Sequence, residues 1–475
     1  DARVRRLLGP TIERAAVPLG CRTPASLRFD GAAPTIGVDA DDLALVQFSS
    51  GTTVAPKPVA LSHRAIIAQV EALNSFWPDD DAVRHSGVSW LPLYHDMGLI
   101  GCIFPALERP SVLTLIGPEI FVTKPALWLR AISRYRATIS VAPNFAYALC
   151  VDRIRDDQLD DVDLASWRVA LNGAEAVSPG VLRAFQERFA AWGFRPEALT
   201  PVYGLSEATL GVTFSRLDQP FRAERFDREA LAEGRAVVTP DGRELIAVGQ
   251  PLPGTAIRIV DATGDELSVG HIGRVQARGP SIMDGYLDRP DATADALSSD
   301  GWLDTGDLGF LHVAPAQDGD GGSDLFLVGR AKDVLILRGR NHDPAEVEHT
   351  VDTVAGARKG CAVAVGYRGE DADTESLWLF VEHARDAASD VLDRLPERCA
   401  EAVLAGAGLR AESVFVVAPG TLPRTSSGKL RRSETLRRHL AGELDAPKAV
   451  TPVRLAGELV RSTLAHARAR ARRAG

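Results

Sequence analysis

Apolar residues recur along the chain at two spacings, and segments of the two kinds alternate. Short apolar runs typical of buried strands occupy residues 43–48, 87–93, 138–141 and 169–171. Apolar residues at helical spacing predict helices between and after these runs, over residues 125–135, 145–155 and 179–190. Because strands alternate with helices in this way, the first half of the chain is predicted to form an α/β domain.

The pattern changes after residue 216. Residues 216–249 are polar and irregular, and strands are expected again at residues 256–260 and 273–277, in a β region punctuated by Gly and Pro. Apolar strands at residues 326–328 and 334–337 then flank the polar turn Gly329-Arg330-Ala331-Lys332-Asp333, which is predicted to be a hinge. The last part mixes strands and helices, with strands expected at residues 361–365, 377–381 and 414–417 and helices at residues 388–404 and 433–440.

The predicted fold is therefore α/β with two domains. Residues 1–331 are expected to form a large N-terminal domain of several subdomains, with layered α/β sheets and a β region. Residues 332–475 are expected to form a small α+β domain, with the hinge near Lys332. The first forty residues predict a short helix followed by a loop, and residues 319–323 predict the tip of a hairpin.

Composition restricts the function more than the fold. The chain has 475 residues, 45% of them hydrophobic, and a net charge of -9, which argues against a protein that coats nucleic acid. Its five cysteines lie far apart without a CxxC pair, so neither a disulfide framework nor a zinc site is predicted and a reduced cytoplasm fits best. The sequence contains no apolar run near the roughly 20 residues of a transmembrane helix and no signal peptide. Because residue 1 is Asp and not Met, the start is expected to be cut or processed.

A hydroxyl-rich loop follows the first predicted strand. It reads Ser49-Ser50-Gly51-Thr52-Thr53 and is followed by Lys57. Backbone N–H groups of such a loop can surround phosphate oxygens, while hydroxyl groups and a lysine neutralise their charge. Taken alone, the same residues also fit a Ser/Thr-rich turn, and they do not match the GxxxxGK[ST] pattern.

The segment from Ser49 to His63 resembles the phosphate-loop motif of the adenylate-forming superfamily, which includes acyl-CoA synthetases, luciferases, nonribosomal-peptide adenylation domains and fatty acyl-AMP ligases. Further motifs follow in the family's order, and the resemblance extends from about residue 43 to the end of the chain. These motifs are Tyr94-His95-Asp96-Met97-Gly98, Asn172-Gly173-Ala174-Glu175, Tyr203-Gly204-Leu205-Ser206-Glu207, Thr305-Gly306-Asp307, Gly329-Arg330-Ala331-Lys332-Asp333 and Thr425-Ser426-Ser427-Gly428-Lys429. The phrases LYHDMGLIG, LNGAEAV, YGLSEATL and GRAKDVLILRGRNHDPAEVE look most like the fatty acyl-AMP ligases.

The resemblance implies a ligase that uses ATP and Mg²⁺. Such an enzyme joins a carboxylic acid, here a fatty acid, to AMP with release of pyrophosphate, and then passes the acyl group to the phosphopantetheine thiol of an acyl carrier protein in lipid or polyketide biosynthesis. An acyl-CoA ligase is an alternative, since most of the nucleotide motifs serve both groups. Two further alternatives are a half-enzyme that only transfers the acyl group from acyl-AMP to a thiol, and a non-catalytic binding module.

The resemblance also implies roles for individual residues. Tyr203 would stack on adenine, with Gly173, Ala174 and Glu175 along the edge of the base, and Asp307 would accept hydrogen bonds from the ribose hydroxyls, with Arg330 on the same sugar. Glu207 would coordinate Mg²⁺ beside the phosphates. The full nucleotide-binding set is Ser49, Ser50, Gly51, Thr52, Thr53, Lys57, Gly173, Ala174, Glu175, Tyr203, Gly204, Ser206, Asp307 and Arg330. The structural alternatives are a buried core Tyr203, a helix-start Glu207 and a surface ion pair of Asp307 with Arg330.

Lys429 carries the strongest catalytic expectation. Attack of a carboxylate on the α-phosphate brings two negative groups together, and by resemblance Lys429 of the mobile small domain contacts both. Lys332 occupies the hinge position of the family, and His95 would gate the substrate carboxylate or orient it, although a structural histidine is the alternative. Asn341 and His342 would steady the small domain, while Trp128, Phe145 and Tyr147 fit core positions better than an acyl tunnel.

The chain departs from the family's pattern at several positions. Val54 and Pro58 stand where the phosphate loop generally has glycine, so the loop is expected to close differently over the β- and γ-phosphates. Asp343 and Ala345 stand where fatty acyl-AMP ligases tend to have bulkier or amide residues. The family's opening segment, on the order of a hundred residues, is missing before the phosphate loop. Residues 216–249 are long enough to hold the insertion by which fatty acyl-AMP ligases hamper domain rotation.

Overall fold

A computed structural model describes residues 37–49, 56–77, 84–313, 322–337, 340–369, 375–425 and 429–446. Residues Asp39–Asp445 form one compact unit. The predicted N-terminal helix, most of the phosphate loop (50–55), residues 426–428 and the basic C-terminal tail lie outside the described residues.

The largest sheet of the described residues has seven strands, in the order β11-β8-β7-β6-β5-β3-β4. Five of them are parallel: β4, β3, β5, β6 and β7. Strand β8 is antiparallel to β7, and β11 is antiparallel to β8. Their bounds are β3 (Ser86–Ser89), β4 (Val112–Leu115), β5 (Ile139–Ala142), β6 (Val169–Asn172), β7 (Leu199–Gly204), β8 (Gly211–Phe214) and β11 (Gln250–Pro251).

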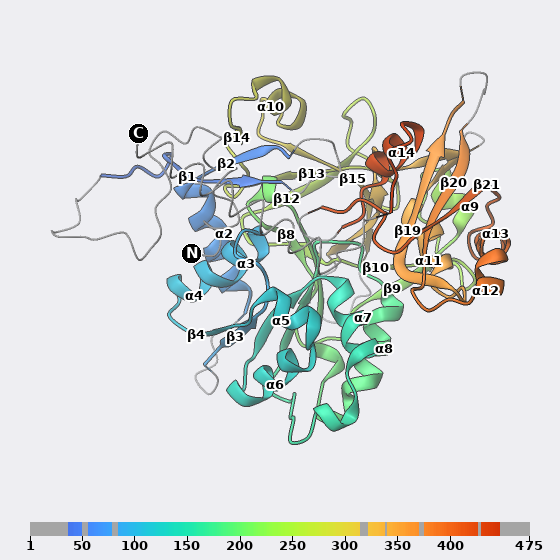
Figure 1. The fold of residues 1–475 in the computed structure, drawn as a ribbon. Helices are drawn as coiled ribbons and strands as arrows, with labels where there is room; N and C mark the ends of the chain where they lie inside the picture. The colour runs from blue at the N-terminus through green and yellow to red at the C-terminus, as the bar shows by residue number, and fades with distance from the viewer. Residues whose placement is uncertain are drawn as a thin grey trace, which may run out of the picture. The chain divides into compact units, whose positions relative to one another are not determined.

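Helices cover this sheet, and the apolar core lies between the sheet and the helices. The ribbon in Figure 1 shows α5 to α8 gathered around the parallel strands. The helices of this region are α2 (His63–Phe76), α3 (Asp96–Gly98), α4 (Phe104–Glu108), α5 (Pro118–Thr123), α6 (Ala126–Tyr135), α7 (Asn144–Arg153) and α8 (Pro179–Phe189). Trp128 and Tyr147 are completely buried in the apolar cluster between sheet and helices, where Trp128 donates to the Ser140 hydroxyl and Tyr147 to the Leu171 carbonyl. Both side chains therefore occupy core positions, as the sequence predicts.

Two further sheets are antiparallel throughout. Strands β1 (Leu43–Phe48), β2 (Pro58–Ser62) and β14 (Gly285–Tyr286) make a three-stranded antiparallel sheet, with helix α10 (Pro290–Ala296) after β14. Strands β12 (Ala256–Val260), β13 (Gly273–Arg278), β15 (Leu303–Val313) and β16 (Ser323–Arg330) make a four-stranded antiparallel sheet. Because Val313 pairs with Ser323, the connection between β15 and β16 is a hairpin, as predicted, with residues 314–321 outside the described part.

The segment 216–249 is more ordered than its polar pattern predicts. It contains the antiparallel pair β9 (Ala223–Phe226) and β10 (Arg243–Ile246), joined through helix α9 (Arg228–Ala232). Phe226, Leu231 and Leu245 of this segment pack against Phe310 and Phe326 of the four-stranded sheet. These few apolar residues are widely separated in sequence, so no window of the segment shows a clear period.

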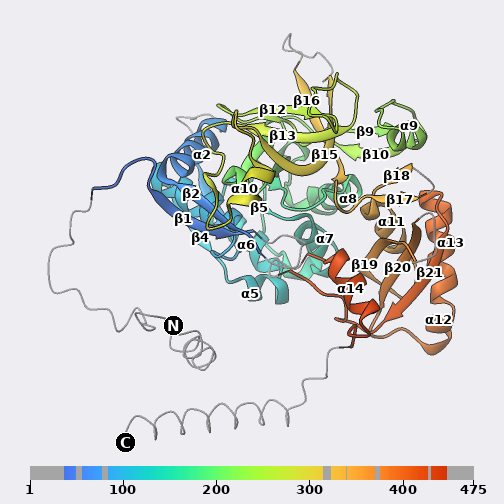
Figure 2. The same cartoon turned by 90° about the horizontal axis from the view of Figure 1, so that it is seen from above.

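The last region is a three-stranded sheet with a helical layer on each face. Strands β19 (Ala357–Tyr367), β20 (Ser376–His383) and β21 (Ala411–Val417) carry apolar side chains alternately on the two faces. One face packs against α11 (Pro344–Val351) and α13 (Leu395–Ala407), and the other packs against α14 (Arg432–Leu440). The strands β17 (Leu335–Leu337) and β18 (Arg340–His342) precede α11 (Figure 2).

The helix predicted over residues 388–404 is divided in two. Helix α12 (Ser389–Asp393) ends before Arg394, and α13 begins at Leu395 with Pro396 in its first turn. Proline has no N–H to donate within a continuous helix but is favoured in a first turn, so Pro396 starts a new helix. Strand β3 is likewise shorter than predicted, because the chain leaves the sheet after Ser89.

Candidate active site

The predicted motifs meet at one edge of the large sheet. Three of these motifs follow the carboxyl ends of parallel strands: the 94–98 motif comes after β3, the 172–175 motif comes at the end of β6, and the 203–207 motif comes at the end of β7. Strands β6 and β7 are neighbours, and in open α/β sheets ligands bind beyond the carboxyl ends of the strands. The topology therefore gathers residues from distant parts of the chain at one site.

Tyr203, Asp307 and Arg330 form a hydrogen-bonded group. The phenol of Tyr203 donates to Oδ2 of Asp307 at 2.6 Å, and Nε of Arg330 lies 3.3 Å from Oδ1 of the same carboxylate. Asp307 on β15 pairs directly with Arg330 on β16, which fixes the ion pair. Burial raises the pKa of Asp307, against the opposing effect of Arg330 and Tyr203, and burial together with Asp307 raises the pKa of Tyr203. Asp307 is 9% exposed, so its ion pair with Arg330 is more than a surface contact.

Glu175 lies beside these residues. It follows Ala174, whose φ of 68° is strained for a residue with a Cβ. Oε1 of Glu175 accepts the N–H of Phe145 at 2.6 Å, and burial raises the pKa of Glu175 although Lys429 and Arg424 act in the opposite direction. The side chain therefore holds the start of α7, where Phe145 is 40% exposed.

The glycines of these motifs have packing roles. A Cβ on Gly173 would lie 2.8 Å from the carbonyl oxygen of Val202, and a Cβ on Gly204 would overlap the carbonyl oxygen of Leu210. Both positions permit backbone segments to approach closely. The structure therefore explains these glycines by the packing of β6, β7 and β8.

Lys429 joins the site from the last region of the chain. Its backbone pairs with Thr425, through the Thr425 N–H to the Lys429 carbonyl at 2.8 Å and the Lys429 N–H to the Thr425 hydroxyl at 3.1 Å. Burial, followed by the charge of Arg330, lowers the pKa of Lys429, and the carboxylates of Glu175, Asp96 and Asp307 raise it. The ammonium group therefore lies within electrostatic reach of carboxylates on three separate motifs.

Asp96 is a site residue that the sequence reasoning did not single out. Its carboxylate accepts the Ser206 hydroxyl, and Oδ1 lies 2.6 Å from Nδ1 of His95. Burial acts to raise the pKa of Asp96, but the contacts with His95 and Ser206 outweigh it and lower the pKa. The signal was its place in the LYHDMGLIG phrase, next to His95, and its Oδ1 also accepts the Met97 N–H at 2.7 Å. His95 thus has a structural partner at Nδ1, and its role toward a substrate remains a prediction.

Glu207 and Lys57 lie on either side of Tyr286. The Tyr286 hydroxyl donates to Oε1 of Glu207 at 2.9 Å, and Nζ of Lys57 lies 4.4 Å from the centroid of the Tyr286 ring. Lys57 follows the phosphate loop, whose ends are joined by the Ser49 N–H donating to the Lys57 carbonyl at 2.9 Å. Ser50, Gly51, Thr52, Thr53 and Val54 lie outside the described residues, so their predicted contacts are not tested.

Pro58 lies at the start of β2, beside the described end of the phosphate loop. It is the first residue of β2, where proline is tolerated, and its carbonyl accepts the N–H of Leu287 at 2.8 Å. The neck of the loop closes through Ser49 and Lys57, so it does not need the N–H that Pro58 lacks.

The donor set suits a metal that is bound mainly through phosphate. The described residues hold no cluster of three or more His, Cys, Asp and Glu side chains arranged for a metal ion. Mg²⁺ is commonly held by one or two carboxylates together with substrate phosphates, and the single carboxylate of Glu207 beside Lys57 matches that requirement.

The hinge segment forms a turn, as predicted. Residues 331–333 make the turn, the Ala331 N–H donates to the Gly306 carbonyl at 3.0 Å, and Lys332 is exposed. In the described part of the chain, each of the five apolar clusters lies wholly before or wholly after this turn. This separation supports a domain boundary at Lys332, which stays a prediction.

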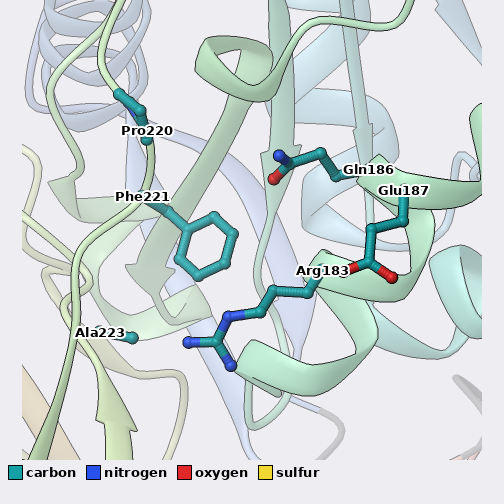
Figure 3. A pocket seen from close by; sticks show the side chains of 6 residues that line it. All are labelled: Arg183, Gln186, Glu187, Pro220, Phe221 and Ala223. Atoms are coloured by element: carbon teal, nitrogen blue, oxygen red, sulfur yellow. The ribbon is translucent and has the colours of Figure 1, made fainter. Parts of the chain in front are cut away.

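A hollow lies between helix α8 and residues 220–223. It has a volume of about 300 Å³, and Figure 3 shows the side chains that line it: Arg183, Gln186, Glu187, Pro220, Phe221 and Ala223. Arg183 of α8 is bound through both terminal nitrogens to Glu244 of β10. None of the predicted site residues lines this hollow, so it is distinct from the candidate active site.

Comparisons with known proteins give a consistent result. Residues 10–287 match the family model described as AMP-binding enzyme. A Caulobacter vibrioides protein that carries the provisional name acyl-CoA synthetase is 36% identical, over 93% of this chain and 77% of its own length. The 4-hydroxyphenylalkanoate adenylyltransferase of Mycobacterium tuberculosis is 35% identical over 84% of this chain and 66% of its own. The medium-chain-fatty-acid–[acyl-carrier-protein] ligase JamA of Moorena producens is 35% identical over 86% of this chain and 69% of its own.

Solved structures agree with these relatives. A structure from a study of fatty acyl-adenylate ligases of E. coli and L. pneumophila superposes with a TM-score of 0.77 at 32% identity, covering 88% of this chain and 73% of that one. The predicted mixed α/β fold is thereby confirmed. Among the described helices, none combines the length and the apolar character needed to cross a bilayer.

Proposed function

Since the chain belongs to the family of AMP-binding enzymes, we propose that it activates a carboxylic acid, preferably a fatty acid, with ATP to give acyl-AMP and pyrophosphate, and then passes the acyl group to a carrier-protein thiol. The family membership and the names of the ligase relatives support the adenylation step. The single observation that carries the proposal for this chain is the buried group of Tyr203, Asp307 and Arg330, in which the phenol and the guanidinium hold the two oxygens of one carboxylate.

Lys429 neutralises charge during adenylation. The substrate carboxylate attacks the α-phosphorus, a P–O bond forms, and the bond to the pyrophosphate leaving group breaks. Negative charge from both reactants meets at this point, and a fixed ammonium group stabilises it more strongly in a partly dehydrated site than in water. Burial lowers the pKa of Lys429, while the surrounding carboxylates favour its protonated form, which is the form that the step requires.

Asp307 and Arg330 hold the ribose. Both oxygens of Asp307 point to polar partners, Tyr203 and Arg330, which orient the carboxylate for the two ribose hydroxyls. The Tyr203 ring is fixed by the same hydrogen bond and offers a face for adenine. Orientation of the nucleotide relative to the acid supplies most of the rate, because the protein forms no covalent intermediate in this reaction.

Glu207 and Lys57 receive the phosphates. Mg²⁺ bound there would neutralise charge on the phosphate oxygens. Lys57 adds a positive charge at the exit of the phosphate loop, and Glu207 presents a carboxylate held at one oxygen by Tyr286. The fit of Pro58 within β2 favours a complete adenylating enzyme over the half-enzyme.

A carrier protein is the proposed acceptor. The segment 216–249 is tied to the region after the hinge by ion pairs: Arg243 contacts Asp343 and Glu346, Arg228 contacts Glu346, and Arg340 lies 3.7 Å from Glu229. These contacts restrain rotation about Lys332, and a large acceptor that brings its own docking energy is better able to overcome them than free CoA. JamA, whose name specifies a carrier protein, supports the same acceptor.

The proposed reaction takes place in the cytoplasm. The four described cysteines, Cys102, Cys150, Cys361 and Cys399, are free thiols. Free, buried thiols are typical of proteins in reducing compartments, where ATP is also available.

The adenylation step is tested by acid-dependent ATP–pyrophosphate exchange across a panel of fatty and 4-hydroxyphenylalkanoic acids. We expect exchange with at least one acid and the strongest exchange with fatty acids. A folded protein that shows no exchange with any acid would rule out adenylation, and consumption of preformed acyl-AMP by a thiol would then identify the half-enzyme.

The acceptor is tested separately. Preformed acyl-AMP is offered with holo carrier protein or with CoA at equal thiol concentration, and product formation is measured by mass spectrometry. We expect transfer to the carrier protein to exceed transfer to CoA. Faster transfer to CoA would instead favour the acyl-CoA ligase, as the Caulobacter relative's name suggests for that protein.

A further inference from the structure

Tyr286 ends a short strand beside the exit of the phosphate loop. In β14, Tyr286 pairs with Val59 and Gly285 pairs with Ala60 of β2. The N–H of Leu287 then donates to the carbonyl of Pro58 at 2.8 Å. Lys57 is the residue just before β2, so the backbone of β14 is held in register with the residues that leave the loop.

The same strand is joined to Glu207. The N–H of Met283 donates to the backbone carbonyl of Glu207 at 2.9 Å, and the Tyr286 hydroxyl donates to its Oε1, also at 2.9 Å. In the part of the chain that the structure describes, Tyr286 is the hydrogen-bond donor to this carboxylate. Segment 283–286 therefore fixes both the backbone and the side chain of Glu207.

Tyr286 is built as a donor at this position. Its side chain is 7% exposed, and the carboxylate of Glu207 is the acceptor for its hydroxyl. The N–H of Tyr286 donates to the hydroxyl of Thr293 at 2.9 Å, which anchors the strand to α10. The ring meanwhile faces Nζ of Lys57 at a distance typical of a cation–π contact.

We infer that Tyr286 is a positioning residue that couples the two phosphate-binding groups: its hydroxyl orients Glu207 for a divalent cation, and its ring holds the ammonium group of Lys57 beside that cation's phosphates. The inference rests on the proposed function for the assignment of Glu207 as the metal ligand. It assigns Tyr286 a role that is independent of the acid substrate and of the acyl acceptor.

The physical reason lies in the two oxygens of the carboxylate. A hydrogen bond to Oε1 stops rotation of the Glu207 carboxylate and leaves Oε2 to a cation. Groups that orient a metal ligand in this way typically change metal affinity by about 10- to 100-fold when they are removed. The ring contact to Lys57 adds a separate, smaller effect on triphosphate binding, since cation–π contacts are weaker than a charge-assisted hydrogen bond.

The test measures metal affinity without turnover. Mn²⁺ serves as the probe, and its dissociation constant is measured by electron paramagnetic resonance with the full-length protein saturated by α,β-methylene-ATP. The variants are Tyr286→Phe, Tyr286→Leu and Glu207→Gln, and the control is Tyr135→Phe, which changes a tyrosine that is 49% exposed at the end of α6. AMP affinity in EDTA is measured for each variant by calorimetry.

We expect Tyr286→Phe to weaken Mn²⁺ binding by about tenfold or more while AMP affinity stays at the wild-type value. Tyr286→Leu should weaken Mn²⁺ to the same degree and, in EDTA, should weaken α,β-methylene-ATP relative to AMP by a further few-fold, because only this variant removes the ring beneath Lys57. Wild-type Mn²⁺ affinity in Tyr286→Phe overturns the inference, as does an equal loss of AMP affinity, which would indicate a general structural defect.

The outcome is separable from that of the proposed function. If the wild type binds Mn²⁺ with the ATP analogue but exchanges pyrophosphate with no acid, the ligase proposal fails while the contrast between tyrosine and phenylalanine still decides the role of Tyr286. If Glu207→Gln leaves Mn²⁺ affinity unchanged, Glu207 is not the metal ligand and the inference is wrong. Should Tyr286→Leu fail to fold, Tyr286→Phe, which keeps the ring, still gives the answer.

Discussion

The regions before and after Lys332 hold their site residues by different means. Before it, Tyr203 and Asp307 lie on or next to strands of buried sheets, in contact with apolar clusters, and they hydrogen-bond to each other. After it, Lys429 lies in a short loop that charged groups anchor on both sides. Arg432 binds Asp333 and Glu348 after the loop, and the buried Glu382 accepts the N–H of Leu422 before it.

The contacts between the two regions are also ionic. Arg243 with Asp343, Arg228 with Glu346, and Lys359 with Asp152 join residues on opposite sides of the turn at 331–333. The pair of Lys359 with Asp152 is exposed and contributes about 0–1 kcal/mol, whereas the pair of Arg243 with Asp343 is largely buried and is the main restraint between the regions. This difference supports the proposal that the nucleoside-binding residues stay in place while Lys429 moves with the region after the turn.

Substitution of Lys429 is the most direct test of this difference between the two regions. Lys429→Ala should lower ATP–pyrophosphate exchange by about 10²- to 10³-fold, because the charge that forms at the α-phosphate loses its ammonium partner. AMP affinity should change little, since Tyr203 and Asp307 remain in place. Lys124→Ala, at an exposed lysine, is the control, and exchange at the wild-type rate in Lys429→Ala would remove Lys429 from the mechanism.

The next largest effect is expected at Arg432. Arg432→Ala leaves the buried carboxylates of Asp333 and Glu348 without their cation and should destabilise the region after Lys332 by about 3 kcal/mol. Thermal unfolding and hydrogen exchange of α11 and α14 measure the loss. Arg437→Ala, on the same helix but half-exposed, should cost much less, because exposed ion pairs are screened by water. Equal losses in the two variants would contradict the proposed anchoring of the loop.

A substitution of Asp307 tests whether the region before Lys332 binds the ribose. Asp307→Asn should weaken AMP binding by roughly 10- to 100-fold, because hydrogen bonds to a charged group contribute about 1.5–3 kcal/mol. Calorimetry with AMP measures the change, and Asp304→Asn, close by on β15, serves as the control. Unchanged AMP affinity in Asp307→Asn would remove the proposed ribose contact.

Arg243 tests the contact between the regions. Arg243→Ala removes the ion pairs to Asp343 and Glu346, and transfer from preformed acyl-AMP to CoA should rise by a few-fold as rotation becomes easier. The ratio of CoA to carrier-protein product is the measurement. Arg235→Ala, whose exposed ion pair with Glu233 stays within its own segment, is the matched control. A ratio that does not change would show that these pairs do not restrain the acceptor step.

The smallest expected effect is a displacement of the pH profile. Burial lowers the pKa of Lys429 below the ordinary lysine value, so its amine loses the proton at a lower pH than a free lysine. Because the protonated form is the active one, exchange should fall on the alkaline side below pH 10.5. Lys429→Arg keeps its charge throughout this range, and its residual activity should lack that decline. A decline at the same pH in Lys429→Arg would assign it to another group.

Local pattern predicted only part of the elements of this fold, and the long helix α2 is among those that it did not predict. The strands at residues 43–48 and 256–260 and the helix after Pro125 have the expected bounds, because each keeps one period over its length. The hairpin of β9 and β10 was missed because its apolar residues are few and are buried by the distant Phe310 and Phe326. The strands of that segment form because of tertiary contacts, and no local apolar period marks them.

In the candidate site, too, residues marked by a local motif were predicted, and residues that act through distant partners were not. Tyr203, Asp307, Arg330 and Lys429 were found because each lies in a short motif, and the structure brings them together. Tyr286 and Arg432 were not found, since each acts through a partner more than seventy residues away and no local spacing marks it. Asp96 was quoted within a motif but given no role, because its hydroxyl partner, Ser206, belongs to another one.

The absence of a shared apolar cluster across residues 331–333 in the described chain also bears on how the protein can be rebuilt. A region that keeps its own core and meets its neighbour through charged side chains can be exchanged for the equivalent region of a relative without repacking either interior. Matching a few partners at positions such as Arg243 and Asp343 is then the main requirement of the graft. The turn at Lys332 is thus a natural junction for chimeric enzymes that combine the acid selection of one parent with the acceptor of another.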